Sequence, residues 1–127
     1  MISLVMLISF ILCLSVFLFS CSSIPTETQS DIESNNWQAV GEYDGSNGLL
    51  EKSELDLQAL SDQFNGGNVS YSAYQSSYLT AVTVYCEPKN TNMLGMLGKP
   101  YLGVCERFPN GAFFRQDWLN AKTSNSR

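Results

Sequence analysis

The sequence contains no histidine, and its seven basic residues are outnumbered by twelve acidic ones. The lack of histidine excludes Ser-His and Cys-His catalytic triads and every zinc site that uses histidine. The net charge of −5 argues against a nucleic-acid-binding protein, because neutralising phosphates requires a basic face. A chain of 127 residues is long enough for one domain and too short for two of ordinary size.

Charge is also absent from the start of the chain, where no charged side chain precedes Glu27. Residues 1–20 contain sixteen apolar residues, and the other four are all serines. Such a block is typical of an export signal or of a membrane span, and it is kept apart from the fold prediction.

The end of this block resembles the lipobox of bacterial lipoproteins, in which a small residue precedes a cysteine that is acylated. Leu18, Ser20 and Cys21 fit that pattern, whereas Phe19 is bulkier than usual. The resemblance predicts a signal peptide over residues 1–20 and lipidation at Cys21. Because each buried methylene contributes ~0.8 kcal/mol, several acyl chains would hold the protein at a membrane. Ser22, rather than Asp, after the cysteine favours the outer membrane.

Two alternatives to acylation remain open at this stage. About 19 apolar residues are enough to cross a bilayer of ~30 Å, so an uncleaved anchor in the inner membrane is one of them. Ordinary cleavage near Ser20–Ser23, which would release a soluble protein, is the other.

Residues 21–36 are predicted to form the acylated N-terminus and a disordered tether. Residues 22–36 hold three acids, no base and no aromatic residue, so they have little apolar surface to bury. The folded domain is then expected over residues 37–121, and residues 122–127 are expected to fray.

The cysteines predict one disulfide bond. Export would remove Cys13 and acylation would use Cys21, which leaves Cys86 and Cys105 in an oxidising compartment. Closing a loop of this length should stabilise the fold by ~3 kcal/mol. A redox or nucleophilic thiol is the less favoured interpretation, because no CxxC pair and no histidine would activate it.

The apolar pattern predicts a mainly α-helical domain. A helix is expected over residues 36–43, in which Asn36 is the cap. Gly41 and Gly45 lie on one side of it, which indicates the close approach of another backbone. A second helix is expected over residues 51–64, ended by Gly66 and Gly67.

The rest of the domain is less clearly patterned. A helix is preferred over a strand for residues 70–85, because an aromatic and apolar stripe persists for three turns. Residues 89–104, between the two cysteines, are expected to form an irregular glycine-rich loop or a short hairpin. A last helix is expected over residues 110–121, with Phe114 and Trp118 on one face.

No motif in the sequence predicts catalysis, a metal site or a cofactor. The segment 44–48 resembles the start of a calcium loop, but Gly48, Leu49 and Leu55 occupy positions where an EF-hand has ligands or glycine. Five acidic residues could supply catalytic carboxylates, but their spacing in the sequence does not single out a pair. These acids are Glu42, Asp44, Glu87, Glu106 and Asp117. The protein is therefore expected not to be an enzyme, and its aromatic residues are expected to form mainly core.

Nine positions together carry a family resemblance. They are Trp37, Gly41, Asp44, Gly45, Gly48, Tyr74, Tyr85, Tyr101 and Gly103, with Cys86 and Cys105 in the same motifs. This pattern is similar to that of the small Gram-negative lipoproteins of domain-of-unknown-function family 2799. Members of that family typically carry a lipobox, so the resemblance also supports acylation at Cys21. The family has no assigned activity, so the resemblance implies no catalytic residue.

The resulting hypothesis is an outer-membrane lipoprotein whose disulfide-stapled helical domain faces the periplasm. It would act as a non-catalytic accessory module that presents an aromatic- and glycine-lined surface to an envelope protein. The alternative hypothesis is a small cell-wall-active enzyme or glycan-binding protein that uses carboxylates near Gly45 and Cys105. A cleft joining Asp44 to Glu106, with a raised carboxylate pKa, would favour that alternative.

Overall fold

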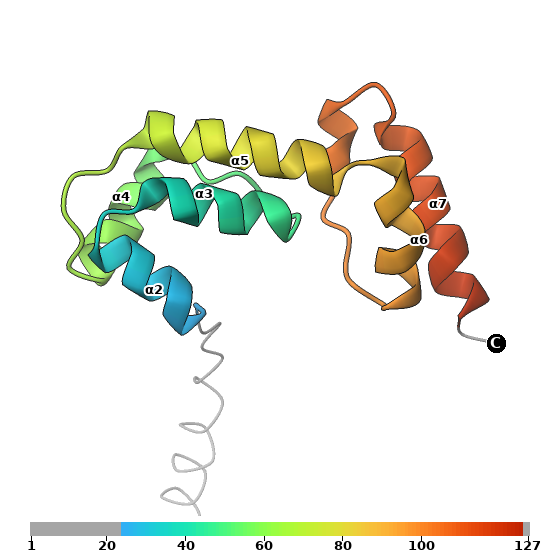
Figure 1. The fold of residues 1–127 in the computed structure, drawn as a ribbon, viewed down its shortest axis with the longest axis horizontal. Coiled ribbons are helices and arrows are strands. Elements are labelled where there is room, and N and C mark those ends of the chain that lie inside the picture. The colour runs from blue at the N-terminus through green and yellow to red at the C-terminus, as the bar shows by residue number, and fades with distance from the viewer. Residues whose placement is uncertain (1–23, 126–127) are drawn as a thin grey trace, which may run out of the picture.

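The computed structural model describes residues 24–125, which are mainly helical and include no strand (Figure 1). The helices are α2 (Thr26–Glu33), α3 (Trp37–Ser46), α4 (Glu54–Gln63), α5 (Tyr71–Tyr85), α6 (Pro88–Met96), the 3-10 helix η2 (Val104–Arg107) and α7 (Gly111–Ser124). The prediction of a mainly α-helical fold is confirmed. The predicted signal peptide and the acylation site at Cys21 lie outside the described residues. Within them, no helix has the length and apolar character needed to cross a membrane.

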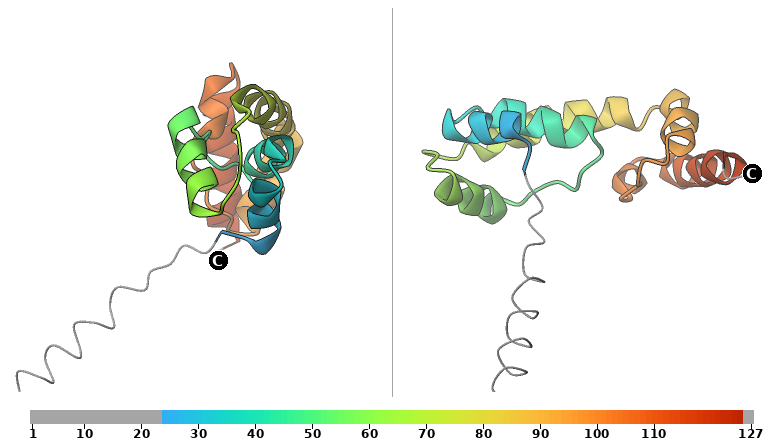
Figure 2. Two further views of the ribbon diagram at one scale, coloured as in Figure 1. Left: turned by 90° about the vertical axis from the view of Figure 1, so that its left-hand side faces the viewer. Right: turned by 90° about the horizontal axis from the view of Figure 1, so that it is seen from below.

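Helices α3 and α5 pack with their backbones almost in contact (Figure 2). A methyl group added at Gly41 would lie 2.2 Å from the carbonyl oxygen of Tyr74, and one at Gly45 would lie 2.5 Å from that of Tyr78. The predicted close approach at these glycines is confirmed. Only a residue without a side chain fits at either position.

The ends of α3 and α4 follow from local hydrogen bonding. The side chain of Asn36 accepts a hydrogen bond from the backbone N–H of Ala39, as predicted for the cap of α3. Ser53 and Asp56 form a capping box at the start of α4. At its end, Asn65 rather than a glycine adopts positive φ (53°).

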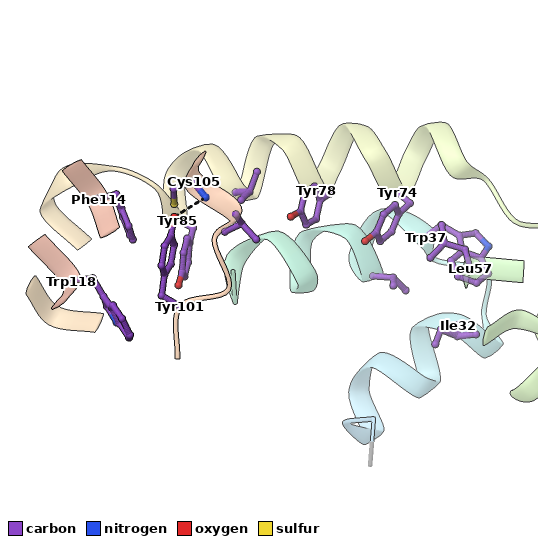
Figure 3. Packing of buried hydrophobic residues seen from close by; sticks show 13 residues of the cluster. Ile32, Trp37, Leu57, Tyr74, Tyr78, Tyr85, Tyr101, Cys105, Phe114 and Trp118 are labelled. Carbon is purple, nitrogen blue, oxygen red and sulfur yellow. Dashed lines mark hydrogen bonds between the residues drawn. The ribbon is translucent and has the colours of Figure 1, made fainter. Parts of the chain in front are cut away.

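Helix α5 buries the stripe that predicted it. Its buried residues are Tyr74, Tyr78, Ala81, Val82 and Tyr85. These side chains join Trp37 and Leu57 in the core, which continues toward Phe114 and Trp118 (Figure 3). The helical prediction for this segment is confirmed, because a period of 3.6 residues puts these five side chains on one face.

The segment between the cysteines differs from the prediction. Residues 88–96 form α6, so the hairpin is wrong and the irregular stretch is limited to residues 97–103. Pro88 occupies the first turn of α6, where a proline favours a helix rather than ending it. Gly95 packs against α7, where an added methyl group would lie 2.6 Å from the carbonyl oxygen of Trp118.

The last helix is longer than predicted. α7 continues to Ser124, and the Asn125 side chain donates a hydrogen bond to the carbonyl of Met96 (2.7 Å). Fraying is therefore the wrong prediction for residues 122–125. The predicted inward positions of Phe114 and Trp118 are confirmed, and Ala121 on the same face is also buried.

The disordered tether is also the wrong prediction for residues 26–33, which form α2. Ile32 is fully buried in the core, and its carbonyl lies against Gly66. Composition missed this helix because a single well-placed apolar side chain is enough to attach a short helix to an existing core.

The pair α3 and α5 and the pair α6 and α7 have the same packing arrangement. We call residues 37–85, which contain α3, α4 and α5, the first unit, and residues 88–124, which contain α6, η2 and α7, the second unit. Gly45 contacts Tyr78, Ala81 and Val82, and Gly95 contacts Trp118, Ala121 and Lys122. The contacted residues thus have the same spacing on α5 and α7. Each position on α3 thus corresponds to the position 50 residues later on α6. Each position on α5 corresponds to the position 40 residues later on α7.

The turns that follow α3 and α6 repeat as well. Gly48 and Gly98 end these helices with nearly equal φ values of 63° and 64°. The hydroxyl of Tyr78 donates to the carbonyl of Leu49 (2.8 Å). At the equivalent places, the indole N–H of Trp118 donates to the carbonyl of Lys99 (2.9 Å).

The predicted disulfide between Cys86 and Cys105 is present, and it lies at the junction of the two units. Beside it, the rings of Tyr85 and Phe114 stack with centroids 5.9 Å apart. Arg107 adds an ion pair to Glu51 (2.7 Å). The second unit is therefore held to the first by one covalent bond and a few side chains around it.

Candidate functional site

The candidate site in the first unit is a buried carboxylate on α3. Asp44 is 1% exposed, and its Oδ2 accepts hydrogen bonds from the Tyr74 hydroxyl (2.8 Å) and from Nζ of Lys52 (2.6 Å). The Tyr74 hydroxyl in turn accepts the backbone N–H of Lys52 (2.9 Å). Asp44 therefore fastens the connection between α3 and α4 to the face of α5.

The electrostatics of this cluster favour a fixed arrangement. Burial raises the pKa of Tyr74 above its ordinary value, and the charge of Asp44 contributes to the rise. Tyr74 thus stays protonated and donates to Asp44 at every ordinary pH. The ammonium of Lys52 compensates the buried carboxylate, as such a charge requires.

The second unit has a comparable cluster around Glu106 in η2. The Tyr101 hydroxyl donates to Oε2 of Glu106 (2.6 Å) and accepts the backbone N–H of Cys105 (3.1 Å). Nε of Arg115 donates to Oε1 of Glu106 (2.5 Å). Burial alone would raise the pKa of Glu106, but the hydrogen bonds from Tyr101 and Arg115 outweigh it and lower the pKa.

Neither of these two carboxylates lines any of the four main grooves and hollows on residues 24–125. Each one instead has a tyrosine and a cation of its own, within its own unit. The same part of the chain contains no group of three or more acidic or cysteine side chains that could hold a metal ion. The arrangement that would have favoured the enzyme hypothesis, a cleft joining Asp44 to Glu106, is not found there.

The motif positions have structural roles that can be stated one by one. Trp37 is buried and donates its indole N–H to the carbonyl of Asn68 (3.0 Å). Gly48 lies against the ring of Tyr85, where a side chain would collide. Gly103 has φ of 84° at the start of η2, a conformation that glycine adopts without strain.

The aromatic- and glycine-lined binding surface stays a prediction, although most of the aromatic side chains that it would use are buried. Among residues 24–125 only one aromatic side chain, Phe113, is exposed. The prediction that the aromatic residues form mainly core is confirmed. Most of the nine motif positions thus have a role in building the fold.

The surface carries two equivalent grooves, one along each helix pair. The groove of the first unit measures about 590 Å³ and is lined by Gln38, Glu42, Ser46, Ala73, Ser76, Ser77, Thr80, Ala81 and Val84. The groove of the second unit measures about 460 Å³ and is lined by Thr91, Asn92, Met96, Asp117, Asn120, Ala121, Ser124 and Asn125. Both are lined mainly by small or polar side chains, and each contains one acid.

Charge is divided unevenly between the two parts of the chain. Residues 24–87 contain ten acids and one base, whereas residues 88–127 contain two acids and six bases. The first part thus carries −9 and the second +4. Sequence reasoning missed this division because it averaged the charge over the whole domain, although counting each half would have found it.

The chain matches one family model, whose description is "Protein of unknown function (DUF2799)", over residues 36–123. The matched range runs from the cap of α3 almost to the end of α7, so it includes both units. Among curated proteins and among solved structures, the chain has no significant match.

Proposed function

The chain belongs to the DUF2799 family, and from this premise we propose that it is an exported, membrane-anchored and non-catalytic module that binds another envelope protein. One observation carries the proposal. The carboxylates best placed for chemistry, Asp44 and Glu106, are each bonded to a tyrosine and a cation of the fold. The pair of shallow grooves offers a surface that is open to a partner.

The anchoring part of the proposal is supported by two features at opposite ends of the chain. The apolar leader ends in Leu18-Phe19-Ser20-Cys21, which resembles a lipobox. The Cys86–Cys105 disulfide requires an oxidising compartment, as an exported protein would meet. An outer-membrane, periplasm-facing location follows from Ser22 after the cysteine.

The binding part of the proposal uses the groove of the first unit. Its small side chains allow the backbone of a partner helix or extended segment to approach α5 closely. Glu42 lies in this groove, and the surrounding part of the chain carries −9. The expected partner is therefore a protein segment with small and basic residues, which complementary charge would guide to the groove.

The anchor is tested by metabolic labelling with a radioactive fatty acid. The wild-type chain should incorporate the label, and Cys21→Ser should not. Cys13→Ser is the matched control and should be labelled like the wild type. A mature wild-type chain whose mass shows an unmodified amino terminus would refute the anchoring part.

The partner is tested with a photo-crosslinking residue at Thr80, in the groove, and at Asp62, on the exposed side of α4, in living cells. A specific adduct is expected from position 80 alone. Ser76→Arg should fill the groove and abolish the adduct, whereas Gln58→Arg, on α4, should keep it. Equal adducts from both positions, or cell-wall fragments cleaved by the pure protein, would refute a non-catalytic groove-binding module.

A further inference from the structure

Three apolar side chains near the end of α6 are exposed. Met93 is 53% exposed, Met96 51% and Leu97 65%. Met96 and Leu97 line a shallow hollow of about 280 Å³ together with Lys122, and Lys99 follows, also exposed. We call Met93, Met96, Leu97, Lys99 and Lys122 the α6 tip.

This exposure follows from the packing of α6. Gly95 and Thr91 are the buried residues of α6, and Gly95 lies against α7. On a helix with 3.6 residues per turn, Met93 and Leu97 then lie on the side opposite Gly95, and Met96 borders the groove between α6 and α7. Their apolar character contributes little to the core of this domain.

The first unit is an internal control for the α6 tip. Ser46 and Asn47 occupy the positions that Met96 and Leu97 occupy in the second unit. Polar residues are therefore compatible with this turn, and the repeated fold does not require methionine or leucine there. An apolar cluster that the fold does not need indicates a contact outside the domain.

The charge around the α6 tip is positive. Residues 88–127 carry +4, and two lysines of this part belong to the tip. Lys122 lies over the ring of Trp118 with Nζ 5.0 Å from its centroid. Of the two acids of this part, Glu106 is held by Arg115, and Asp117 lines the groove of the second unit, which Met96 also borders.

The α6 tip lies on the same side of the molecule as the beginning of α2. In Figure 1 the first turn of α2, the end of α6 and the end of α7 all lie at the lower side. The segment that precedes α2 in the sequence contains the apolar leader and Cys21. A membrane attached to that segment would face the side on which the tip is exposed.

We propose that the α6 tip docks on the surface of a bilayer that contains anionic phospholipid. The side chains of Met93, Met96 and Leu97 enter the boundary between headgroups and acyl chains, where such apolar clusters bind. The ammonium groups of Lys99 and Lys122 meet lipid phosphates, each basic residue near an anionic surface contributing about 1 kcal/mol. This contact goes beyond the proposed function and does not require acylation of Cys21.

The test uses the mature full chain, as purified from cells, mixed with vesicles. Amide hydrogen exchange over residues 92–100 is measured on phosphatidylcholine vesicles and on vesicles that also contain phosphatidylglycerol. Exchange there should slow severalfold on the anionic vesicles, and added salt should reverse the effect. Residues 54–63 of α4 should exchange alike on both kinds of vesicle.

Matched variants separate this contact from a change in folding. The double variant Met96→Ser, Leu97→Asn, which copies the first unit, should lose the protection, and Leu79→Asn, at an exposed apolar residue of α5, should keep it. Lys99→Glu should lose most of it. Three results would overturn the proposal: equal protection on both kinds of vesicle, no protection on either, or protection that appears without vesicles and rises with protein concentration, which would identify a second copy as the occupant.

Discussion

The two units pack their helices in the same way but fill the interface with different chemistry. The first unit places Asp44 and Tyr74 where the second places Leu94 and Phe114. Buried Asp44 needs Lys52 and Tyr74 as partners, whereas the apolar pair needs none. The shared arrangement therefore depends on glycine, alanine and aromatic spacing, and the polar cluster is an addition specific to the first unit.

The units also differ in how their helices are connected. The first connection contains α4 and is fastened by the Asp44 cluster, and the second contains η2 and is fastened by Tyr101 and the disulfide. Where the first unit has Gly41, the second has Thr91, and contact between α6 and α7 is less extensive than between α3 and α5. The glycine at position 41 thus marks the tighter of the two helix pairs.

The largest loss of stability is expected when Gly41 is replaced by the residue of the second unit. Gly41→Thr copies the second unit but places a side chain 2.2 Å from the carbonyl oxygen of Tyr74. We expect a loss of about 4 kcal/mol in the free energy of unfolding, since backbone cannot yield as a side chain can. Urea unfolding followed by circular dichroism measures it. Gly98→Ala, where nothing lies within 4 Å, should cost only about 1 kcal/mol for its positive φ.

Removing the covalent junction should have the next largest effect. The double variant Cys86→Ser, Cys105→Ser is expected to lose about 3 kcal/mol, because the unfolded chain regains the freedom of the closed loop. Hydrogen exchange should show faster opening of α6 and α7 than of α3. Equally faster hydrogen exchange in both units would mean that they unfold together. That result would contradict the inference that the second unit is held mainly at its junction with the first.

Replacing the polar cluster by its apolar counterpart tests the comparison directly. Asp44→Leu alone should cost about 2 kcal/mol, because Tyr74 and Lys52 lose their buried acceptor. Adding Tyr74→Phe should recover part of that loss, since the pair then matches Leu94 and Phe114. A double-mutant cycle from urea unfolding measures the coupling. Strictly additive losses would show that the two units are not equivalent at these positions.

The smallest effect is expected from pH. The pKa values of Glu51 and Glu106 are lowered from 4.5 in the folded chain, because hydrogen bonds and ion pairs from Arg107 and Arg115 outweigh the effect of burial. Their contribution is present above pH 4.5 and is lost as the pH falls through the folded values. Thermal unfolding between about pH 7 and pH 3 should show this loss, and Glu106→Gln should make the dependence shallower.

Much of the fold could be predicted from short-range pattern. The stripe on α5, the cap at Asn36 and the paired glycines on α3 each carry a local signal, and the two distal cysteines leave one pairing. Gly95 and Gly98 misled the prediction for α6, because Gly95 lies within the helix against α7 and only Gly98 ends it. Ile32 misled the prediction for α2, because its burial depends on contacts made by distant residues.

The candidate site could be predicted only in part. Asp44 and Glu106 were identified as residues of interest, but their separate tyrosine and cation partners depend on the three-dimensional fold. The repeat of the two units was hidden because it rests on two glycines, an alanine and an aromatic residue in each copy. Such a pattern becomes recognisable only when backbone contacts show which positions correspond.

The disulfide encloses the whole of α6 in a covalent ring that runs from Cys86 to Cys105. A protease that cuts at the exposed end of α6 would open this ring without separating the chain into two pieces. Such a nicked molecule would keep the mobility of a single chain on a non-reducing gel and would divide only after thiol treatment. Comparison of the two gels therefore reports whether the end of α6 is shielded in the cell.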